Sequence, residues 1–228
     1  MIGDCSADVV SSTVPCSTKW MKGTVNSFYI GIIATVIATA LGTLAALGLS
    51  RPHMPYKGLI MAILISPMIV PLIITAAGMF FFYARINLVY TFTGVILAHV
   101  ALATPFVVIT VTATLVGFDM NMVKAAQSLG AKPMRTFFKV IMPLILPGII
   151  SGALFAFITS FDEVVIVMFM ASIDQLTIPK QMWAGIRQEI SPVILCMATC
   201  LVLLSIFLLT TVELLRRRSE KLRGIKAR

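Results

Sequence analysis

Apolar residues along this chain gather in five long runs separated by shorter polar stretches. The runs cover residues 25–49, 59–82, 88–115, 144–171 and 193–215. A helix needs about 20 residues to cross the hydrocarbon core of a bilayer, and only closed backbone hydrogen bonding is stable there. Short alternating segments typical of barrel strands do not occur in the sequence. The pattern therefore predicts an all-α polytopic membrane protein, a bundle of about five transmembrane helices.

The composition agrees with a lipid environment. The 228 residues are 59% hydrophobic and 12% charged, with a mean hydropathy of +1.01. A soluble domain has about 45–50% apolar and about 25% charged residues. The net charge of +9 would point to nucleic acid in a soluble protein. Here the basic residues lie between and after the apolar runs, where they act as topology signals, so we expect the lipid bilayer as a partner and no nucleic acid.

The distribution of basic residues predicts the orientation. With the carboxyl terminus inside, thirteen of the 18 lysines and arginines fall on the cytoplasmic side. This bias is the one expected of a multi-pass inner (plasma) membrane protein with the N-terminus outside and the C-terminus cytoplasmic. We expect residues 1–20 to form a polar external segment, 21–215 the transmembrane domain and 216–228 a basic cytoplasmic tail.

The amino-terminal segment carries two further expectations. Its first twenty residues lack a basic region followed by an apolar run, so we expect no cleavable signal peptide. Cys5 and Cys16 either form a disulfide, if they face an oxidising compartment, or remain reduced.

Small residues and prolines predict how the helices pack. Pro67 and Pro71 remove backbone donors, so we expect a break at residues 66–71 that either lines a pathway or is healed by neighbouring groups. Pro105 predicts a kink in the third span. In the first span, a stripe of small residues recurs every four positions and predicts the close approach of another helix: Ala34, Ala38, Gly42 and Ala46.

The cytoplasmic stretch at about 117–143 has its own predicted structure. Asp119 is placed to cap a short helix from Met120 to Leu129. Gly130 suits a left-handed stop after that helix. Pro133 then opens a second short helix that reaches Pro143. A helix–Gly–helix element at the membrane face is suited to docking on a soluble partner.

The same stretch matches a family signature. Lys124-Ala125-Ala126, Gly130 and the segment 140–143 (Val-Ile-Met-Pro) resemble the "EAA" motif of binding-protein-dependent ABC importer permeases. That motif is Glu-Ala-Ala, three residues, Gly, nine residues, Ile, one residue and Leu-Pro, and the spacing agrees throughout. Lys124 replaces Glu, and Val140 and Met142 replace Ile and Leu. Because Lys124 reverses a charge, a partner contact made by that Glu does not carry over.

Further segments narrow the resemblance. Residues 66–71, 105–108, 115–119 and 160–165 look like the spermidine/putrescine permease branch, and the likeness covers roughly residues 20–215. It implies a type I ABC importer permease-like fold with a cytoplasmic coupling-helix loop, in a bacterial inner membrane. The family's usual subunit has six spans, so this chain is expected to begin after the first of them.

The resemblance also implies a function and partners. The chain would be a transmembrane subunit of an ATP-driven importer for polyamines, paired with a second permease subunit, two ATPase subunits and an extracytoplasmic solute-binding protein. No P-loop sequence occurs, so we expect a non-catalytic subunit that binds no cofactor or metal, with ATP and Mg on the partner ATPase subunits. The resemblance assigns coupling to the ATPase subunit to six residues: Lys124, Ala125, Ala126, Leu129, Gly130 and Pro143.

Two adjacent acids, Asp162 and Glu163, interrupt the fourth apolar run. Acids at membrane depth usually face a cavity or a partner. They would suit a cationic substrate, with Ser160 adding a hydrogen bond and Phe161 an aromatic face to a substrate pathway. We expect Asp162 to be the more sensitive of the two acids.

Other interpretations remain open at this point. The acids either line that pathway, lie near the outer headgroups, or pair with Arg85 or Arg187. The substrate could instead be an amino acid, an opine, sulfate or thiosulfate, or iron. A secondary transporter would use the acids as proton relays but would normally show an internal repeat, and an intramembrane aspartyl protease would need two aspartates within the membrane.

Overall fold

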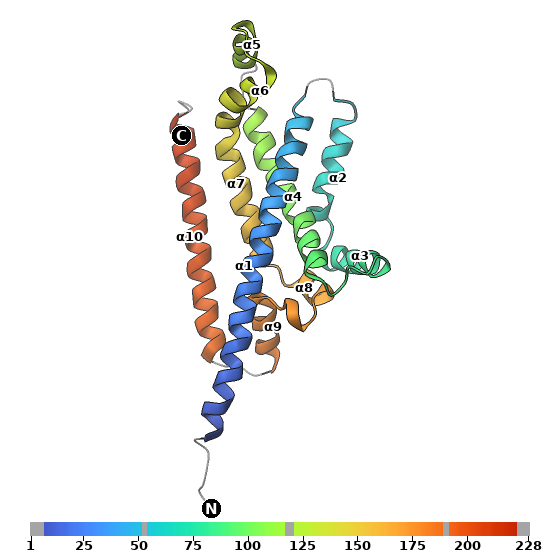
Figure 1. Ribbon diagram of the computed structural model, residues 1–228, viewed down its shortest axis with the longest axis vertical. Helices are drawn as coiled ribbons and strands as arrows, with labels where there is room; N and C mark the ends of the chain where they lie inside the picture. The colour runs from blue at the N-terminus through green and yellow to red at the C-terminus, as the bar shows by residue number, and fades with distance from the viewer. Residues whose placement is uncertain (1–6, 52–53, 117–120, 189–191, 223–228) are drawn as a thin grey trace, which may run out of the picture.

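The computed structural model describes residues 7–51, 54–116, 121–188 and 192–222, which fold as helices. Most of them run along a common direction (Figure 1). The elements in chain order are α1 (Ala7–Leu49), α2 (Lys57–Ile69), α3 (Leu72–Arg85), α4 (Phe92–Val116), α5 (Asn121–Ser128), α6 (Pro133–Thr136), η1 (Phe137–Ile141, a π turn), α7 (Met142–Phe161), α8 (Val165–Met170), η2 (Ile173–Gln175), α9 (Ile178–Gln188) and α10 (Pro192–Leu222). Four described helices are long and apolar enough to cross a membrane, or up to five if α2 and α3 count as one bent span. The predicted fold class is confirmed.

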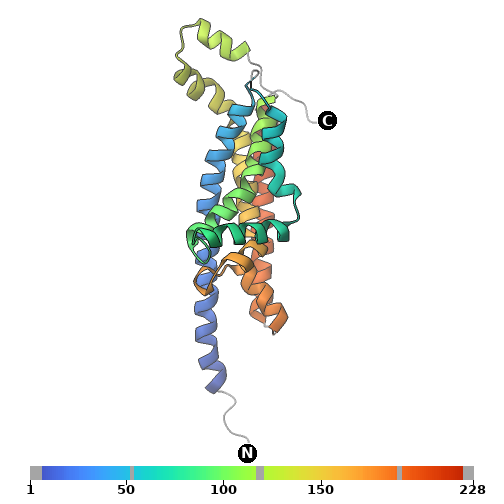
Figure 2. The same ribbon diagram turned by 90° about the vertical axis from the view of Figure 1, so that its right-hand side faces the viewer.

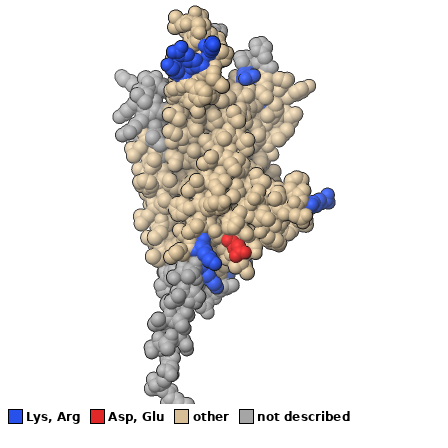
Figure 3. All heavy atoms as spheres, in the orientation of Figure 1, with Lys and Arg blue, Asp and Glu red and all other residues tan. Residues whose placement is uncertain are grey.

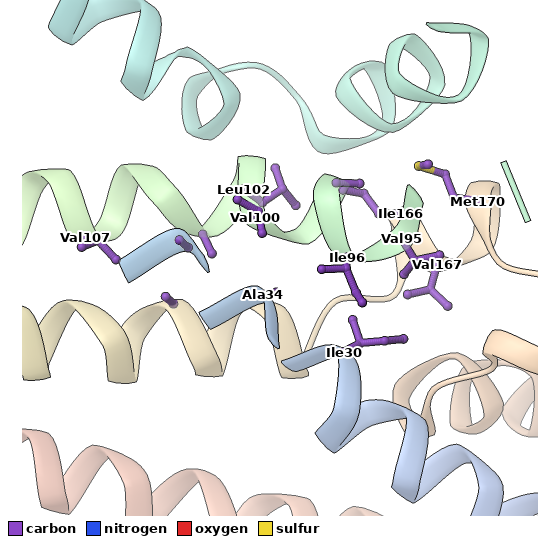
Figure 4. Packing of buried hydrophobic residues seen from close by; sticks show 14 of the residues in the cluster. Ile30, Ala34, Val95, Ile96, Val100, Leu102, Val107, Ile166, Val167 and Met170 are labelled. Atoms are coloured by element: carbon purple, nitrogen blue, oxygen red, sulfur yellow. The ribbon is translucent and has the colours of Figure 1, made fainter. Parts of the chain in front are cut away.

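The core of the bundle is the contact between α1, α4 and α7, with α8 closing one end. The predicted small-residue stripe of α1 is buried against α4, and a Cβ added to Gly42 would lie 2.7 Å from the Cβ of Val107. Figure 4 shows Ile30 and Ala34 of α1 beside the apolar side chains of α4, with Ile166 and Met170 of α8 on the same cluster. The expectation that this stripe admits a close neighbour is confirmed.

The predicted break in the second span is also confirmed. The axes of α2 and α3 meet at 103°, and α3 lies across the bundle direction (Figure 2). Val70 is extended, with φ −70° and ψ 137°, as expected for a residue that precedes a proline. Within α2, the Ser66 hydroxyl donates to the Ile63 carbonyl at 2.8 Å, the carbonyl that Pro67 leaves without its usual amide donor. The Ser66 hydroxyl thus satisfies the carbonyl that Pro67 leaves without a donor.

The loop after α4 has the predicted helix–Gly–helix form. Asp119 and Met120 lie outside the described residues, but α5 occupies most of the predicted short helix. Gly130 has φ +77°, and the Ala131 amide donates to the Ala126 carbonyl at 3.1 Å, which is the Schellman ending of a helix. Pro133 opens α6 at its first turn, as predicted.

The second short helix does not stop at Pro143, and that prediction is wrong. Residues Pro133–Phe161 form one helix of 29 residues through α6, η1 and α7. The π turn explains why the proline is tolerated. The Met142 amide donates to the Phe137 carbonyl, five residues back, so the widened turn gives room to a ring that would otherwise clash with the preceding turn.

The fourth apolar run does not form one span to residue 171 as predicted. The helix ends at Phe161 with Asp162 as its C-cap, and a second helix, α8, begins at Val165. The start of α8 is stabilised by the Glu163 carboxylate, which accepts a hydrogen bond from the Ile166 amide at 2.8 Å and so satisfies a free donor of that helix. Both acids therefore lie in a connection between helices.

Charged side chains gather toward the two ends of the bundle, and many large apolar side chains are exposed on the helices between them. Figure 3 shows basic side chains at the end that carries α5 and α6, and charged side chains of both signs toward the opposite end. Two helices extend beyond the predicted spans, since α1 begins at Ala7 and α10 continues to Leu222. The alternatives for Cys5 and Cys16 involve side chains outside the described residues.

Candidate coupling surface and substrate pathway

The element formed by α5 and Gly130 projects beyond the helix bundle (Figure 2). Met122, Ala125 and Leu129 are spaced to lie on one face of α5, and all three are exposed, Leu129 to 87%. Met134, on α6, adds another exposed apolar side chain, 71% accessible. Contiguous exposed apolar groups of this kind mark interaction sites. We call the four residues Met122, Ala125, Leu129 and Met134 the coupling surface.

The structure brings together most of the residues predicted to couple to an ATPase. Ala125, Ala126, Leu129 and Gly130 lie in α5 and its cap, with Ala126 partly buried and the other three exposed. Pro143 lies apart from them, exposed at the first turn of α7. The side chain of Lys124 is outside the described part of the chain. Three exposed basic residues flank the element on the side of α6 and η1: Lys132, Arg135 and Lys139.

The four predicted pathway residues have different surroundings. Asp162 is exposed, whereas Glu163 is 7% accessible. Among the described residues neither acid forms an ion pair, and the guanidinium of Arg187 instead lies over the Trp183 ring, 5.5 Å from its centroid. The break therefore leaves the Asp162 side chain exposed and that of Glu163 buried.

The other two predicted pathway residues are engaged inside the bundle. The Ser160 hydroxyl lies 2.8 Å from Nδ1 of His99, a buried residue of α4. The Phe161 ring packs edge-on against Phe28, with centroids 5.1 Å apart, and stacks on Phe157 at 5.4 Å. His99 was missed by the sequence analysis, although a histidine inside an apolar span was the available signal.

The short helix α8 is held by side chains at both ends. Glu163 accepts from the first turn, as described above, and the ammonium of Lys180 donates to the carbonyls of Val167 and Ala171, both at 3.2 Å. Burial lowers the pKa of Lys180 from its usual value. Glu163 therefore stabilises the first turn of α8, whereas Asp162 is the C-cap of α7 and has an exposed side chain.

A groove of about 540 Å³ runs between α1 and α7. Its lining combines apolar side chains with threonine hydroxyls and includes no charged residue: Thr35, Val36, Thr39, Ala40, Thr43, Leu44, Leu47, Phe137, Met142, Ile149 and Ala153. An apolar lining offers no counter-charge to a cation. The exposed acid at the α7–α8 break therefore remains the better candidate for contact with a cationic substrate.

Comparison with known protein families gives a match over most of the chain. The family described as "Binding-protein-dependent transport system inner membrane component" matches residues 27–221. The chain is 29% identical over 200 residues to the spermidine/putrescine transport system permease protein PotC of Haemophilus influenzae, covering 88% of this chain and 78% of that protein. It is 28% identical over 212 residues to the putrescine transport system permease protein PotI of Escherichia coli K12, with 85% and 75% covered.

Solved structures share the fold. A chain of an amino acid ABC transporter matches with a TM-score of 0.66 at 18% identity, covering 96% of this chain and all of the other. A chain of the MetNI methionine ABC transporter in an inward-facing conformation matches with a TM-score of 0.64 at 18% identity, covering 93% and 99%. The resemblance drawn from the sequence is confirmed.

Proposed function

Because this chain belongs to the family of binding-protein-dependent transport system inner membrane components and is a permease subunit of an ABC importer, we propose that it imports polyamines such as spermidine and putrescine. The relatives named for these cargoes support the substrate class. The observation that carries the proposal is the exposed carboxylate of Asp162 at the break between α7 and α8. An ammonium group needs such a counter-charge in a pathway whose walls are apolar.

The partners follow from the same proposal. A second permease subunit completes the pathway, an extracytoplasmic binding protein delivers the cargo, and two ATPase subunits hold ATP and Mg. This chain supplies no catalytic residue. The coupling surface docks on one ATPase subunit, and closure of the ATPase pair moves it. The continuous helix Pro133–Phe161 carries that motion to the acids by a rigid-body shift.

The proposed orientation places the coupling surface in the cytoplasm and η2 outside. In a variant without the native cysteines, we expect Asp174→Cys to react with an impermeant thiol reagent on intact cells. Gln127→Cys is expected to react only after the cells are permeabilised. Both side chains are exposed, so access to the compartment decides the result. Labelling of Gln127→Cys in sealed cells would reverse the assignment.

The cargo is tested by uptake of radiolabelled spermidine and putrescine in cells that lack other polyamine importers. Asp162→Asn keeps the shape of the side chain and removes its charge. Hydrogen bonds to charged groups contribute about 1.5–3 kcal/mol, so we expect uptake to fall by about tenfold or more. Glu163→Gln is expected to have a smaller effect because its amide oxygen still accepts from Ile166 and the side chain is buried.

Asp174→Asn is the matched control, since it neutralises another exposed acid, on η2. It should leave uptake unchanged. Wild-type uptake by the double variant Asp162→Asn/Glu163→Gln would exclude a role for charge at the break. Transport of an anion by the intact complex would contradict the proposed substrate class.

A further inference from the structure

His99 is a buried polar side chain of α4 to which the proposed function gives no role. It is 1% accessible and surrounded by the apolar core. Its Nδ1 lies 2.8 Å from the Ser160 hydroxyl, while its Nε2 is buried and has no hydrogen-bond partner among the residues that the structure describes. A buried nitrogen without a hydrogen bond carries a free-energy cost that an apolar residue would avoid. The contact with Ser160 is therefore where we look for the role of the imidazole.

Ser160 belongs to a row of small residues that faces α4 along α7. A Cβ added to Gly152 would lie 3.0 Å from the Val107 Cα, and one added to Gly148 would lie 2.9 Å from the Thr114 Cβ. Small residues allow close approach, but their contacts are weakly directional. A hydrogen bond has a preferred angle and length. The pair His99–Ser160 therefore sets the rotation of the last turn of α7.

That last turn determines where the acids point. Ser160 precedes the C-cap Asp162 by two residues, and the helix closes there with the Asp162 amide donating to the Ile158 carbonyl at 3.0 Å. Beyond the cap, the Glu163 carboxylate reaches forward to the first turn of α8. Helix ends fray unless a contact fixes them, so the pair fixes the starting point for both acids.

The burial of the His99 ring limits the ways in which this residue can affect transport. Because the side chain is buried, a solute in contact with Asp162 does not reach the imidazole. The effect of His99 therefore passes through Ser160.

We propose that His99 is a positioning residue of the permease, which holds Ser160 and thereby sets the exposed orientation of Asp162 at the α7–α8 break. The inference rests on the proposed pathway at Asp162 for its link to transport. The geometric part, that His99 sets the environment of Asp162, stands independently of the cargo.

The first test is kinetic. His99→Leu and Ser160→Ala are each expected to raise the apparent KM for spermidine uptake by about tenfold. The double variant should be no worse than either single one, because both changes remove the same contact. His99→Asn places an amide close to the position of Nδ1 and is expected to bring the KM back to within about twofold of the parent.

The Tm of the complex distinguishes a positioning role of His99 from a purely structural one. Removing both partners of a buried hydrogen bond is close to neutral for stability, so the purified complex with the double variant should keep its Tm. Thr112→Val is the matched control, since Thr112 is another buried residue of α4, and its hydroxyl has no hydrogen-bond partner in the described part of the chain. Its KM should not change. A loss of uptake that tracks only the amount of permease in the membrane would overturn the proposal.

The second test needs no cargo. With Asp162→Cys in a background free of native cysteines, the rate of modification by a small cationic thiol reagent reports the exposure of that position. Adding His99→Leu should change the rate several-fold, whereas adding Thr112→Val should not. An altered rate, together with no polyamine uptake by the complex that keeps Asp162, would refute the proposed cargo and support the positioning role. Equal rates in all three proteins would refute the positioning role.

Discussion

Replacing Gly152 with leucine is expected to reduce the amount of permease in the membrane several-fold. Gly152 lies in α7 against α4, and an added Cβ would meet the Thr110 hydroxyl and lie 3.0 Å from the Val107 Cα. The second contact is with backbone, so a rotamer change does not relieve it. Overpacking of a closely packed contact costs about 1–3 kcal/mol or more. Immunoblots of membrane fractions and the Tm of the purified complex measure the effect.

The control for this prediction is Gly48→Leu. Gly48 lies in α1, and a Cβ added there meets nothing within 4 Å. Leucine favours the helix over glycine by several tenths of a kcal/mol, so the variant should accumulate at least as well as the parent. Gly152→Ala should lose less than Gly152→Leu, and Thr110→Ala should partly restore it because it removes the nearest atom. Equal abundance of Gly152→Leu and Gly48→Leu would show that close approach of α4 and α7 is not required.

Replacing Gly130 with valine is expected to abolish transport without removing the permease from the membrane. Gly130 has φ +77°, a conformation that costs an L-residue about 1–2 kcal/mol and a β-branched residue more. A Cβ at this position meets nothing within 4 Å, so the effect comes from the backbone. Loss of the Schellman turn changes the direction of α5 and moves the coupling surface. Uptake and co-purification with the ATPase subunits measure the result.

Gly130→Asn is the matched variant, because asparagine tolerates the left-handed conformation better than other side chains. It should retain most of the uptake. Ala125→Asp tests the surface itself by placing a charge on its exposed apolar face, and it should weaken co-purification without changing membrane abundance. Normal uptake by both Gly130→Val and Ala125→Asp would exclude this loop as the coupling element.

The sequence predicts those features of the fold that depend on local pattern. Long apolar runs locate the spans, and Pro71 explains why Val70 turns out of the helix. Gly130 and Pro133 end and begin helices through their own backbone preferences. Each of these signals lies within a few residues of the feature that it determines.

Features made by contacts between distant residues are not predictable in this way. Asp162 and Glu163 interrupt the fourth run, but residues 165–170 after them are again apolar, so the pattern does not show whether the helix continues through the acids. The position of α8 also depends on other elements, since the Tyr90 amide donates to the Met170 carbonyl at 3.0 Å. The partner of Ser160 is His99, 61 residues away. The two acids therefore locate the candidate site in the sequence, but the sequence does not show that Asp162 is exposed and Glu163 is buried.

Because residues Pro133–Phe161 form one helix, the direction in which the chain leaves one end is fixed relative to the direction in which it leaves the other. Each residue of an α-helix advances the chain by about 100° around the axis, so one added or deleted residue would turn the loop before Pro133 by that angle relative to Asp162. The π turn at Phe137–Ile141 holds one residue more than a regular turn. Deleting one residue there would leave a regular turn and keep the phase of the two ends, whereas a deletion within the regular turns of α7 would make α5 face a different side of the bundle. Length variation among permeases of this kind should therefore be found outside this helix, where a loop absorbs the rotation.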